Sequence, residues 1–284
     1  MEHENSTVVR EFVLLGLSHT RKVQPVLFFF LQLFYVIVLP RNILLILTVQ
    51  RDSKLGSPMH FFLVNLAFLD ICYCSVTLPR TLADLFSNPQ NIAYNACMAQ
   101  LLFLHFLGAA EMFPLLAMAY DRYVAICKPL RYTVLVNRTV CHVLVGASWG
   151  GGFLHGIIVF ALTIRLPFCG LNILDNFFCD IRQLAKLACT NTYTVELLMF
   201  LNNGIVIITC FVLLLISYTV LLLKLQTHST KAKKKITSTC VSHIVVVFVT
   251  FGPAIYIYVL PFQAVPVEKV VALFHTVIFP LTNP

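Results

Sequence analysis

Four ionisable residues lie in or beside long apolar runs of this sequence, and they are the side chains best placed to do chemistry. Asp121 and Arg122 are adjacent within "LLAMAYDRYVAICKPL" (115–130), where an acid and a base can form an ion pair. Asp70 and Glu111 lie inside apolar stretches. In lipid such a side chain costs roughly 2.5–3.5 kcal/mol, so its presence indicates a function.

Signatures of catalysis do not accompany these charges. The sequence has no His-Glu-x-x-His and no pair of catalytic aspartates, and its histidines are scattered along the chain. We therefore expect no enzymatic activity, no cofactor and no metal beyond a sodium ion at the two buried acids.

The elements that must position these residues follow from composition. Of 284 residues, 59% are hydrophobic and 11% charged, with a mean hydropathy of +0.86, whereas a soluble domain is about 25% charged. A helix crosses the hydrocarbon core of a membrane with about 20 residues, and lipid leaves no alternative to helices for such segments. The predicted fold is an all-α membrane protein, one domain over 1–284, with a bundle of seven transmembrane helices at about 25–49, 58–79, 97–120, 141–164, 196–223, 238–261 and 267–284.

Loop charges predict the orientation of the bundle. One set of loops holds eleven Lys or Arg residues against two Asp residues, and the other holds eight basic against eight acidic residues. The basic set faces the cytoplasm, which places the N-terminus outside and the C-terminus inside. Asn5 of "NST" then lies outside as a glycosylation acceptor. The net charge of +8 is a topology signal, so we expect lipid and no nucleic acid as a partner.

Four cysteines fall on the predicted outer side, where disulfides persist. Cys97 begins the third span, and Cys169, Cys179 and Cys189 lie in the following outer loop. Four cysteines allow three pairings, and spacing alone does not choose among them. The other six are expected to be small buried apolar side chains.

Several segments together resemble the olfactory receptor branch of the rhodopsin-like G-protein-coupled receptors. They occur in order along nearly the whole chain as "EFVLLGLS" (11–18), "PMHFFLVNLAFLD" (58–70), "MAYDRYVAIC" (118–127), "FFCD" (177–180), "SY" (217–218), "STCVSH" (238–243) and "PLTNP" (280–284). The resemblance implies an odorant receptor in the plasma membrane of sensory cilia, which activates a stimulatory, olfactory-type G protein and raises cyclic AMP.

The resemblance also assigns roles to residues. Arg122 pairs with Asp121 in the resting state, and outward movement of the sixth helix releases it toward the G protein. Tyr123 and Tyr218 belong to the same switch. Disulfides join Cys97 to Cys179 and Cys169 to Cys189, and Asp70 and Glu111 face each other in a polar core that can hold sodium.

Helical periodicity selects candidate ligand contacts in the outer half of the bundle. These are Leu104, His105, Gly108, Ala109 and Met112 in the third span, Asn202, Asn203 and Val206 in the fifth, and Phe251, Ile255 and Tyr258 in the sixth. They match the positions that line the odorant site in the family. The set is mostly apolar and lacks acids, which favours small neutral volatiles over cationic amines.

Three features depart from the family pattern. Arg41 stands within the first span, where Asp70 is its expected partner. Pro114 removes one backbone hydrogen bond inside the third helix and favours a kink there. After "PLTNP" relatives continue with Ile-Tyr and a short amphipathic helix. The alternative is therefore a family member that does not signal or is poorly expressed. A small-solute transporter would show inverted repeats, and no two halves of the chain match.

Overall fold

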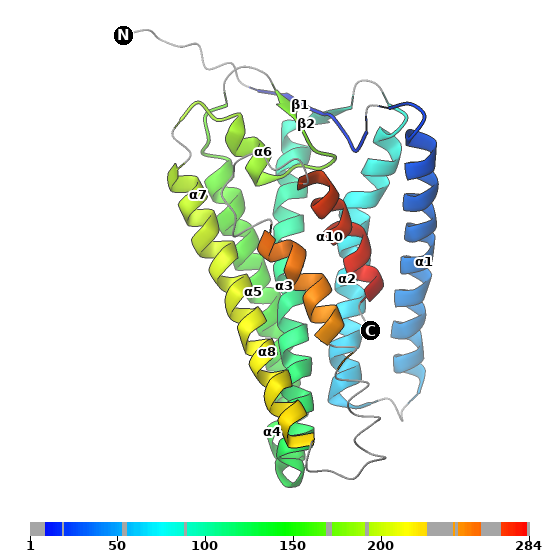
Figure 1. Ribbon diagram of the computed structural model, residues 1–284, viewed down its shortest axis with the longest axis vertical. Coiled ribbons are helices and arrows are strands. Elements are labelled where there is room, and N and C mark those ends of the chain that lie inside the picture. The colour runs from blue at the N-terminus through cyan, green and yellow to red at the C-terminus, as the bar shows by residue number, and fades with distance from the viewer. Residues whose placement is uncertain are drawn as a thin grey trace.

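The computed structural model describes residues 9–18, 20–52, 56–87, 90–168, 172–190, 193–225, 241, 244–256 and 268–282. Within them, five helices are long and apolar enough to cross a membrane. These are α1 (Gln24–Arg51), α2 (Pro58–Asp84), α3 (Tyr94–Cys127), α5 (Arg138–Thr163) and the run Tyr193–Lys224. Figure 1 shows them side by side along the long axis of the molecule.

The fifth long helix is interrupted by a wider turn. It consists of α7 (Tyr193–Met199), the π-helical turn η3 (Phe200–Gly204) and α8 (Ile205–Leu225). Two shorter helices, Ile244–Tyr256 and α10 (Glu268–Thr282), correspond to the predicted sixth and seventh spans. The first five predicted spans therefore coincide with membrane-length helices, whereas the seven-span count stays a prediction.

Local sequence explains where the helices begin. Pro25 lies in the first turn of α1 and Pro58 begins α2. Proline suits these positions because the first N–H groups of a helix have no acceptor within the helix, so the missing N–H group of proline costs no hydrogen bond. Asn137 caps α5 by accepting a 2.9 Å hydrogen bond from the backbone N–H of Val140. Pro114 is buried inside α3, which continues as one helix from Tyr94 to Cys127. The third helix therefore does not end at Pro114, and a kink at this residue stays a prediction.

Helices α3 and α5 approach each other closely through small residues. A Cβ atom built on Gly152 would lie 2.8 Å from the Cβ of Ala110, and one on Gly156 would lie 3.0 Å from the carbonyl oxygen of Leu102. Ser148, one turn earlier on the same face, donates a 2.7 Å hydrogen bond to the carbonyl oxygen of Ala110. Small residues at four-residue spacing let helix backbones pack tightly in lipid.

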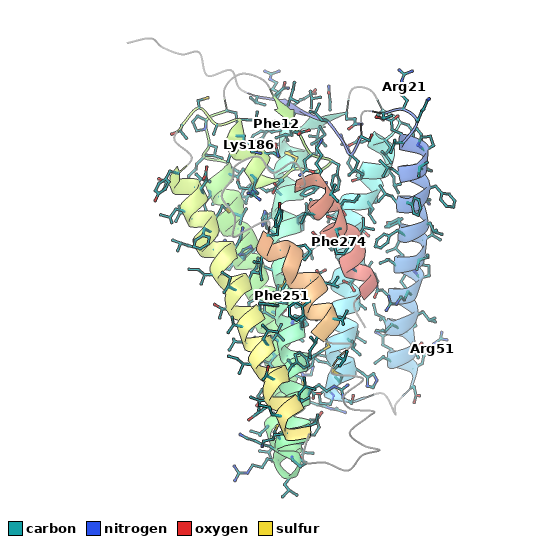
Figure 2. All side chains as sticks on the ribbon, in the orientation of Figure 1. Phe12, Arg21, Arg51, Lys186, Phe251 and Phe274 are labelled. Atoms are coloured by element: carbon teal, nitrogen blue, oxygen red, sulfur yellow. A yellow bond between two sulfur atoms is a disulfide. The ribbon has the colours of Figure 1, made fainter. Side chains whose placement is uncertain are left out.

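Large apolar side chains on the outside of the bundle fit a lipid environment. Phe29 and Phe30 on α1 are 64% and 63% exposed. An apolar surface along a whole helix is unfavourable in water and favourable in lipid. Arg21 and Arg51 lie near opposite ends of this helix (Figure 2), so the apolar surface lies between polar ends.

A small β-sheet at one end of the bundle corrects the all-α prediction. Strand β1 (Glu11–Leu14) lies between β2 (Asn91–Ala93), to which it is antiparallel, and β3 (Ile173–Leu174), to which it is parallel. These strands are too short to show a two-residue periodicity. Their position between helices also depends on contacts between distant parts of the chain. Short helices complete the loops: η2 (Pro129–Arg131), α4 (Tyr132–Leu135) and α6 (Ile181–Lys186).

Candidate functional site

A cavity lies among α2, α3, α5, the η3–α8 segment, Ile244–Tyr256 and α10, beneath the loop that precedes α6. Its volume, counted as space for the centres of water molecules, is about 80 Å³, several times the roughly 10–15 Å³ that one water needs. Seven of the predicted ligand contacts line it: Leu104, His105, Gly108, Ala109, Met112, Asn203 and Val206.

The remaining predicted contacts lie elsewhere. Asn202 is partly buried beside His155, and Phe251 is fully buried with its ring centroid 5.9 Å from that of Phe211. Ile255 packs against the same apolar core. These three residues are not in the cavity lining, and Tyr258 lies outside the described residues.

Periodicity on three helices missed much of the lining. The additional residues come from four other parts of the chain as well as from neighbouring positions, and they are Tyr73, His155, Asn176, Phe178, Cys179, Asp180, Ile207, Ala254, Ala272 and Thr276. The "FFCD" segment at 177–180, adjacent to a predicted disulfide, was the available signal for the loop residues. The three helix faces alone had predicted a lining without acids, and this prediction is wrong because Asp180 of the loop lines the cavity.

The cavity wall is mainly apolar, with polar groups from α3, α5 and η3. The rings of His105 and His155 lie with centroids 5.9 Å apart. Asn203 is 2% exposed and follows the α7 helix in the π-helical turn, a local widening that is frequent at functional sites. Such a wall suits a small, largely apolar molecule with one polar group.

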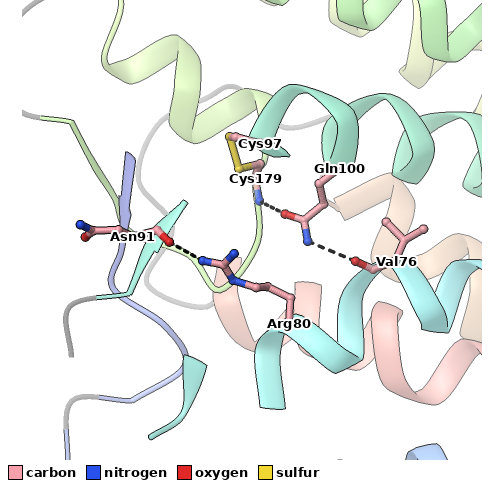
Figure 3. Close-up of a disulfide and its surroundings, with 6 residues drawn as sticks. All are labelled: Val76, Arg80, Asn91, Cys97, Gln100 and Cys179. Carbon is pink, nitrogen blue, oxygen red and sulfur yellow. Dashed lines mark hydrogen bonds between the residues drawn. A yellow bond between two sulfur atoms is a disulfide. The ribbon is translucent and has the colours of Figure 1, made fainter. Parts of the chain in front are cut away.

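A disulfide fixes the cover of the cavity to α3. Cys97 and Cys179 are bonded, as predicted, with their Cα atoms 5.4 Å apart. Gln100, one turn along α3, accepts a 3.0 Å hydrogen bond from the N–H of Cys179 and donates one of 3.3 Å to the carbonyl oxygen of Val76. Figure 3 shows Gln100 between the two elements. Cys189 is also disulfide-bonded, but Cys169, its predicted partner, lies outside the described residues.

The cover is also tied to the N-terminal segment and α10. Lys269 forms a 2.5 Å ion pair with Asp175 and donates a 3.2 Å hydrogen bond to the carbonyl oxygen of Gly16. Arg80 of α2 pairs with Asp84 at 2.7 Å and donates to the carbonyl oxygen of Asn91. Lys269 thus joins three separate segments and Arg80 joins two more, all at the end of the bundle that carries the β-sheet.

The two predicted intramembrane acids lie deep in the bundle. Asp70 and Glu111 are both fully buried and are close enough to interact electrostatically. Neither carboxylate oxygen of Glu111 has a hydrogen-bond partner among the described residues, an arrangement that fits a cation or a shared proton. Among the described residues, no group of three or more His, Cys, Asp or Glu side chains could hold a metal ion. Arg41 is exposed, and its pairing with Asp70 stays a prediction.

At the opposite end of α3, Asp121 has a hydrogen-bond partner that the prediction did not include. The hydroxyl of Tyr132 in α4 donates a 2.7 Å hydrogen bond to Asp121, whereas no Asp121–Arg122 contact within 4.0 Å is found among the described ion pairs. Neighbouring residues of a helix point in different directions, and the Nε atom of Arg122 is buried without a hydrogen-bond partner in the described structure. Burial, and then this hydrogen bond, raise the pKa of Tyr132.

Two further predicted switch residues surround this site. Tyr218 of α8 is 3% exposed and belongs to the same apolar core that Tyr123 contacts. Ser217 donates a 3.5 Å hydrogen bond to the carbonyl oxygen of Ala119. Helices α3 and α8 therefore meet beside Asp121 and Arg122.

The sequence contains one pattern that occurs in catalytic serine sites, because "GASWG" (146–150) matches Gly-x-Ser-x-Gly. In the structure Ser148 is 1% exposed inside α5 and donates to Ala110. A nucleophilic serine of this motif would instead stand exposed on a strand-to-helix turn. Ser148 is therefore a packing residue.

Membrane-length apolar helices around a covered cavity define a multi-pass membrane protein. The sequence model of the family described as "Olfactory receptor" matches residues 31–284. Two human and mouse relatives, Olfactory receptor 4N5 (Homo sapiens) and Olfactory receptor 4M1 (Mus musculus), are each 53% identical to this chain, over all of it and over 92% and 91% of their own lengths. The chain belongs to the olfactory receptor family.

Proposed function

We propose that this protein is an odorant receptor that binds small, mostly apolar volatiles in the cavity beneath the Cys97–Cys179 disulfide. The observation that carries the proposal is the cavity itself. Seven residues selected by helical periodicity line one cavity with a mostly apolar wall. The family relationship supports odorants as the ligand class.

The proposed architecture is a bundle of seven spans with the N-terminus outside the cell. The helices Ile244–Tyr256 and α10 supply the sixth and seventh spans. In this orientation the disulfide and the small sheet are extracellular, and Arg51, Arg131 and Arg138 are cytoplasmic, in keeping with the bias of basic residues toward the cytoplasm. Asn5 and the basic run 231–235, both outside the described residues, are then a glycan acceptor and a contact with anionic lipid or a G protein.

Signalling is proposed to pass from the cavity to the other end of α3. Odorant binding changes the packing of α3, α8 and Ile244–Tyr256, and Arg122 becomes available to a stimulatory, olfactory-type G protein that raises cyclic AMP. Asp121, Tyr123, Tyr132 and Tyr218 hold the resting arrangement. The proposal fits an unpartnered Arg122 Nε atom at the junction of two helices and the two-state behaviour that a ligand can bias.

The experiment is odorant-evoked cyclic AMP in cells that carry an N-terminally tagged chain at their surface. An odorant panel is expected to contain agonists for the natural chain. Arg122→Ala should abolish their cyclic AMP response while odorants still stabilise the purified protein against heat. Surface-exposed protein that neither responds to nor is stabilised by any odorant would contradict the proposal, and stabilisation without cyclic AMP would favour a non-signalling receptor.

A further inference from the structure

The polar residue of the cavity with the clearest unmet hydrogen-bonding capacity is Asn203. Its Oδ1 atom is buried and has no hydrogen-bond partner in the described part of the chain. Its Nδ2 group lies 3.6 Å from the sulfur of Met199, and a thioether is only a weak acceptor. This contact orients the Asn203 amide. If the amide were turned over, its oxygen would face the thioether sulfur, and neither atom can donate a hydrogen bond. Burial without a partner is unfavourable for an amide oxygen.

The π-helical turn explains why Asn203 reaches the cavity. The N–H of Ile205 bonds to the carbonyl oxygen of Phe200, five residues earlier, so the turn holds one residue more than an α-helical turn. Asn203 and Gly204 are buried, whereas Leu201 is exposed. The Asn side chain has a broad preference about its last torsion, so a small rotation can bring Oδ1 to a group in the cavity.

We infer that Asn203 is the specificity-determining residue of the cavity, where it accepts a hydrogen bond from the O–H group of an alcohol or phenol. The inference rests on the proposed function, because it requires that odorants occupy this space. The oxygen of the same hydroxyl group can also accept a hydrogen bond. Donors for it are available in the imidazoles of His105 and His155, which line the same cavity. A neutral imidazole carries one donor and one acceptor nitrogen. The only carboxylate in the described lining, Asp180, lies in the cover and has other interactions.

Ethers of the same formula separate this inference from general apolar binding. The probes are three isomeric pairs: octanol and heptyl methyl ether, cyclohexylmethanol and cyclohexyl methyl ether, and phenylethanol and benzyl methyl ether. Within each pair the atoms are the same in number and only the alcohol can donate. Binding is measured as thermal stabilisation of the purified protein over a concentration series, so the result does not depend on coupling to a G protein.

The natural chain is expected to bind at least one alcohol about 10- to 100-fold more tightly than its ether, since the ether leaves the amide oxygen unpaired. Asn203→Leu should reduce that ratio to about one. Asn203→Ser, which is shorter but keeps an acceptor, should retain part of the preference and guards against misfolding of the leucine variant. The matched control is Thr250→Val, which should preserve the full ratio. It removes a different buried polar atom, a hydroxyl that also lacks a partner in the described structure and is not part of the cavity lining.

Equal binding of alcohol and ether in every pair, or binding of none of the three alcohols, would overturn the inference. An ether or another odorant that evokes cyclic AMP under those conditions would leave the proposed function standing. Persistence of the alcohol preference in folded Asn203→Leu protein would show that another group accepts the hydroxyl. Failure of all odorants in the surface-expression assay contradicts the proposed function itself.

Discussion

The hydroxyl of Tyr132 donates a 2.7 Å hydrogen bond to the carboxylate of Asp121, and so joins the loop helix α4 to the C-terminal end of α3. Asp121 is 3% exposed, and a buried carboxylate depends on such partners because burial removes its hydration. The contact connects a residue of the proposed switch to a segment that sequence reasoning had not linked to it.

Tyr132→Phe is expected to destabilise the protein by about 1–3 kcal/mol, because it leaves one oxygen of Asp121 without a donor. The measurement is the thermal unfolding of the purified protein in detergent. Tyr120→Phe is the matched control, since Tyr120 lies next to Asp121 on α3 and is 40% exposed. Equal unfolding temperatures for the two variants would show that the Tyr132 contact contributes no stability.

This contribution should not vary with pH near neutrality. The pKa of Tyr132 is raised above its ordinary value, so its hydroxyl is protonated below about pH 10 in both the folded and unfolded states. The stabilisation is fully present below the unfolded-state pKa and is lost only as pH rises through the higher folded-state pKa. The difference between natural chain and Tyr132→Phe should therefore be constant from about pH 6 to pH 9. A loss of the difference within this range would point to another titrating group.

Gly152→Ala should impair folding, because its Cβ would lie 2.8 Å from backbone and side-chain atoms of Ala110. Overpacking of this kind costs typically 1–3 kcal/mol, and α3 and α5 can relieve it only by moving apart. Gly150→Ala is the control on the same helix, where a Cβ meets no atom within 4 Å. Surface staining of tagged protein should fall for the first variant and not for the second. Equal staining would show that the helix contact tolerates a methyl group.

Gln100→Leu should loosen the cover of the cavity, since it removes the acceptor of the Cys179 N–H and the donor to Val76 together. We expect a loss of about 1–3 kcal/mol in stability and weaker odorant binding with the disulfide intact. Both can be read from thermal unfolding with and without agonist. Asn91→Ala provides a comparison at the same end of the bundle, because it keeps the backbone carbonyl that accepts from Arg80 and removes only an exposed 3.3 Å hydrogen bond from the Asn91 side chain to Glu11. Unchanged agonist binding in Gln100→Leu would show that the disulfide alone positions the cover.

Sequence reasoning succeeded where a single helix determines the result. The length of apolar runs located the long helices, and periodicity along α3 identified all five of its cavity residues, from Leu104 to Met112. It also placed Asn203 but did not separate it from Asn202, because the π-helical turn shifts the faces of the fifth helix. A regular helical repeat does not contain that shift.

The features that escaped prediction depend on chain segments far apart in sequence. Asn176 and Asp180 reach the cavity because the disulfide folds their loop over α3. Tyr132 meets Asp121 because the chain turns back through η2 and α4. The strands of the small sheet hold each other only after the helices have brought their loops together. None of these relations appears as a local pattern.

The most direct test of the account fills the cavity from within. A Cβ on Gly108 would have Tyr73 as its nearest neighbour, at an unstrained 3.7 Å, and Leu favours helix over Gly, so Gly108→Leu should fold and reach the surface. Odorant-evoked cyclic AMP of surface-matched Gly108→Leu and natural chain is the measurement. The account predicts that agonists of the natural chain lose at least about tenfold in potency in the variant, because its side chain occupies their space. An unchanged dose response at equal surface density would contradict odorant binding in this cavity.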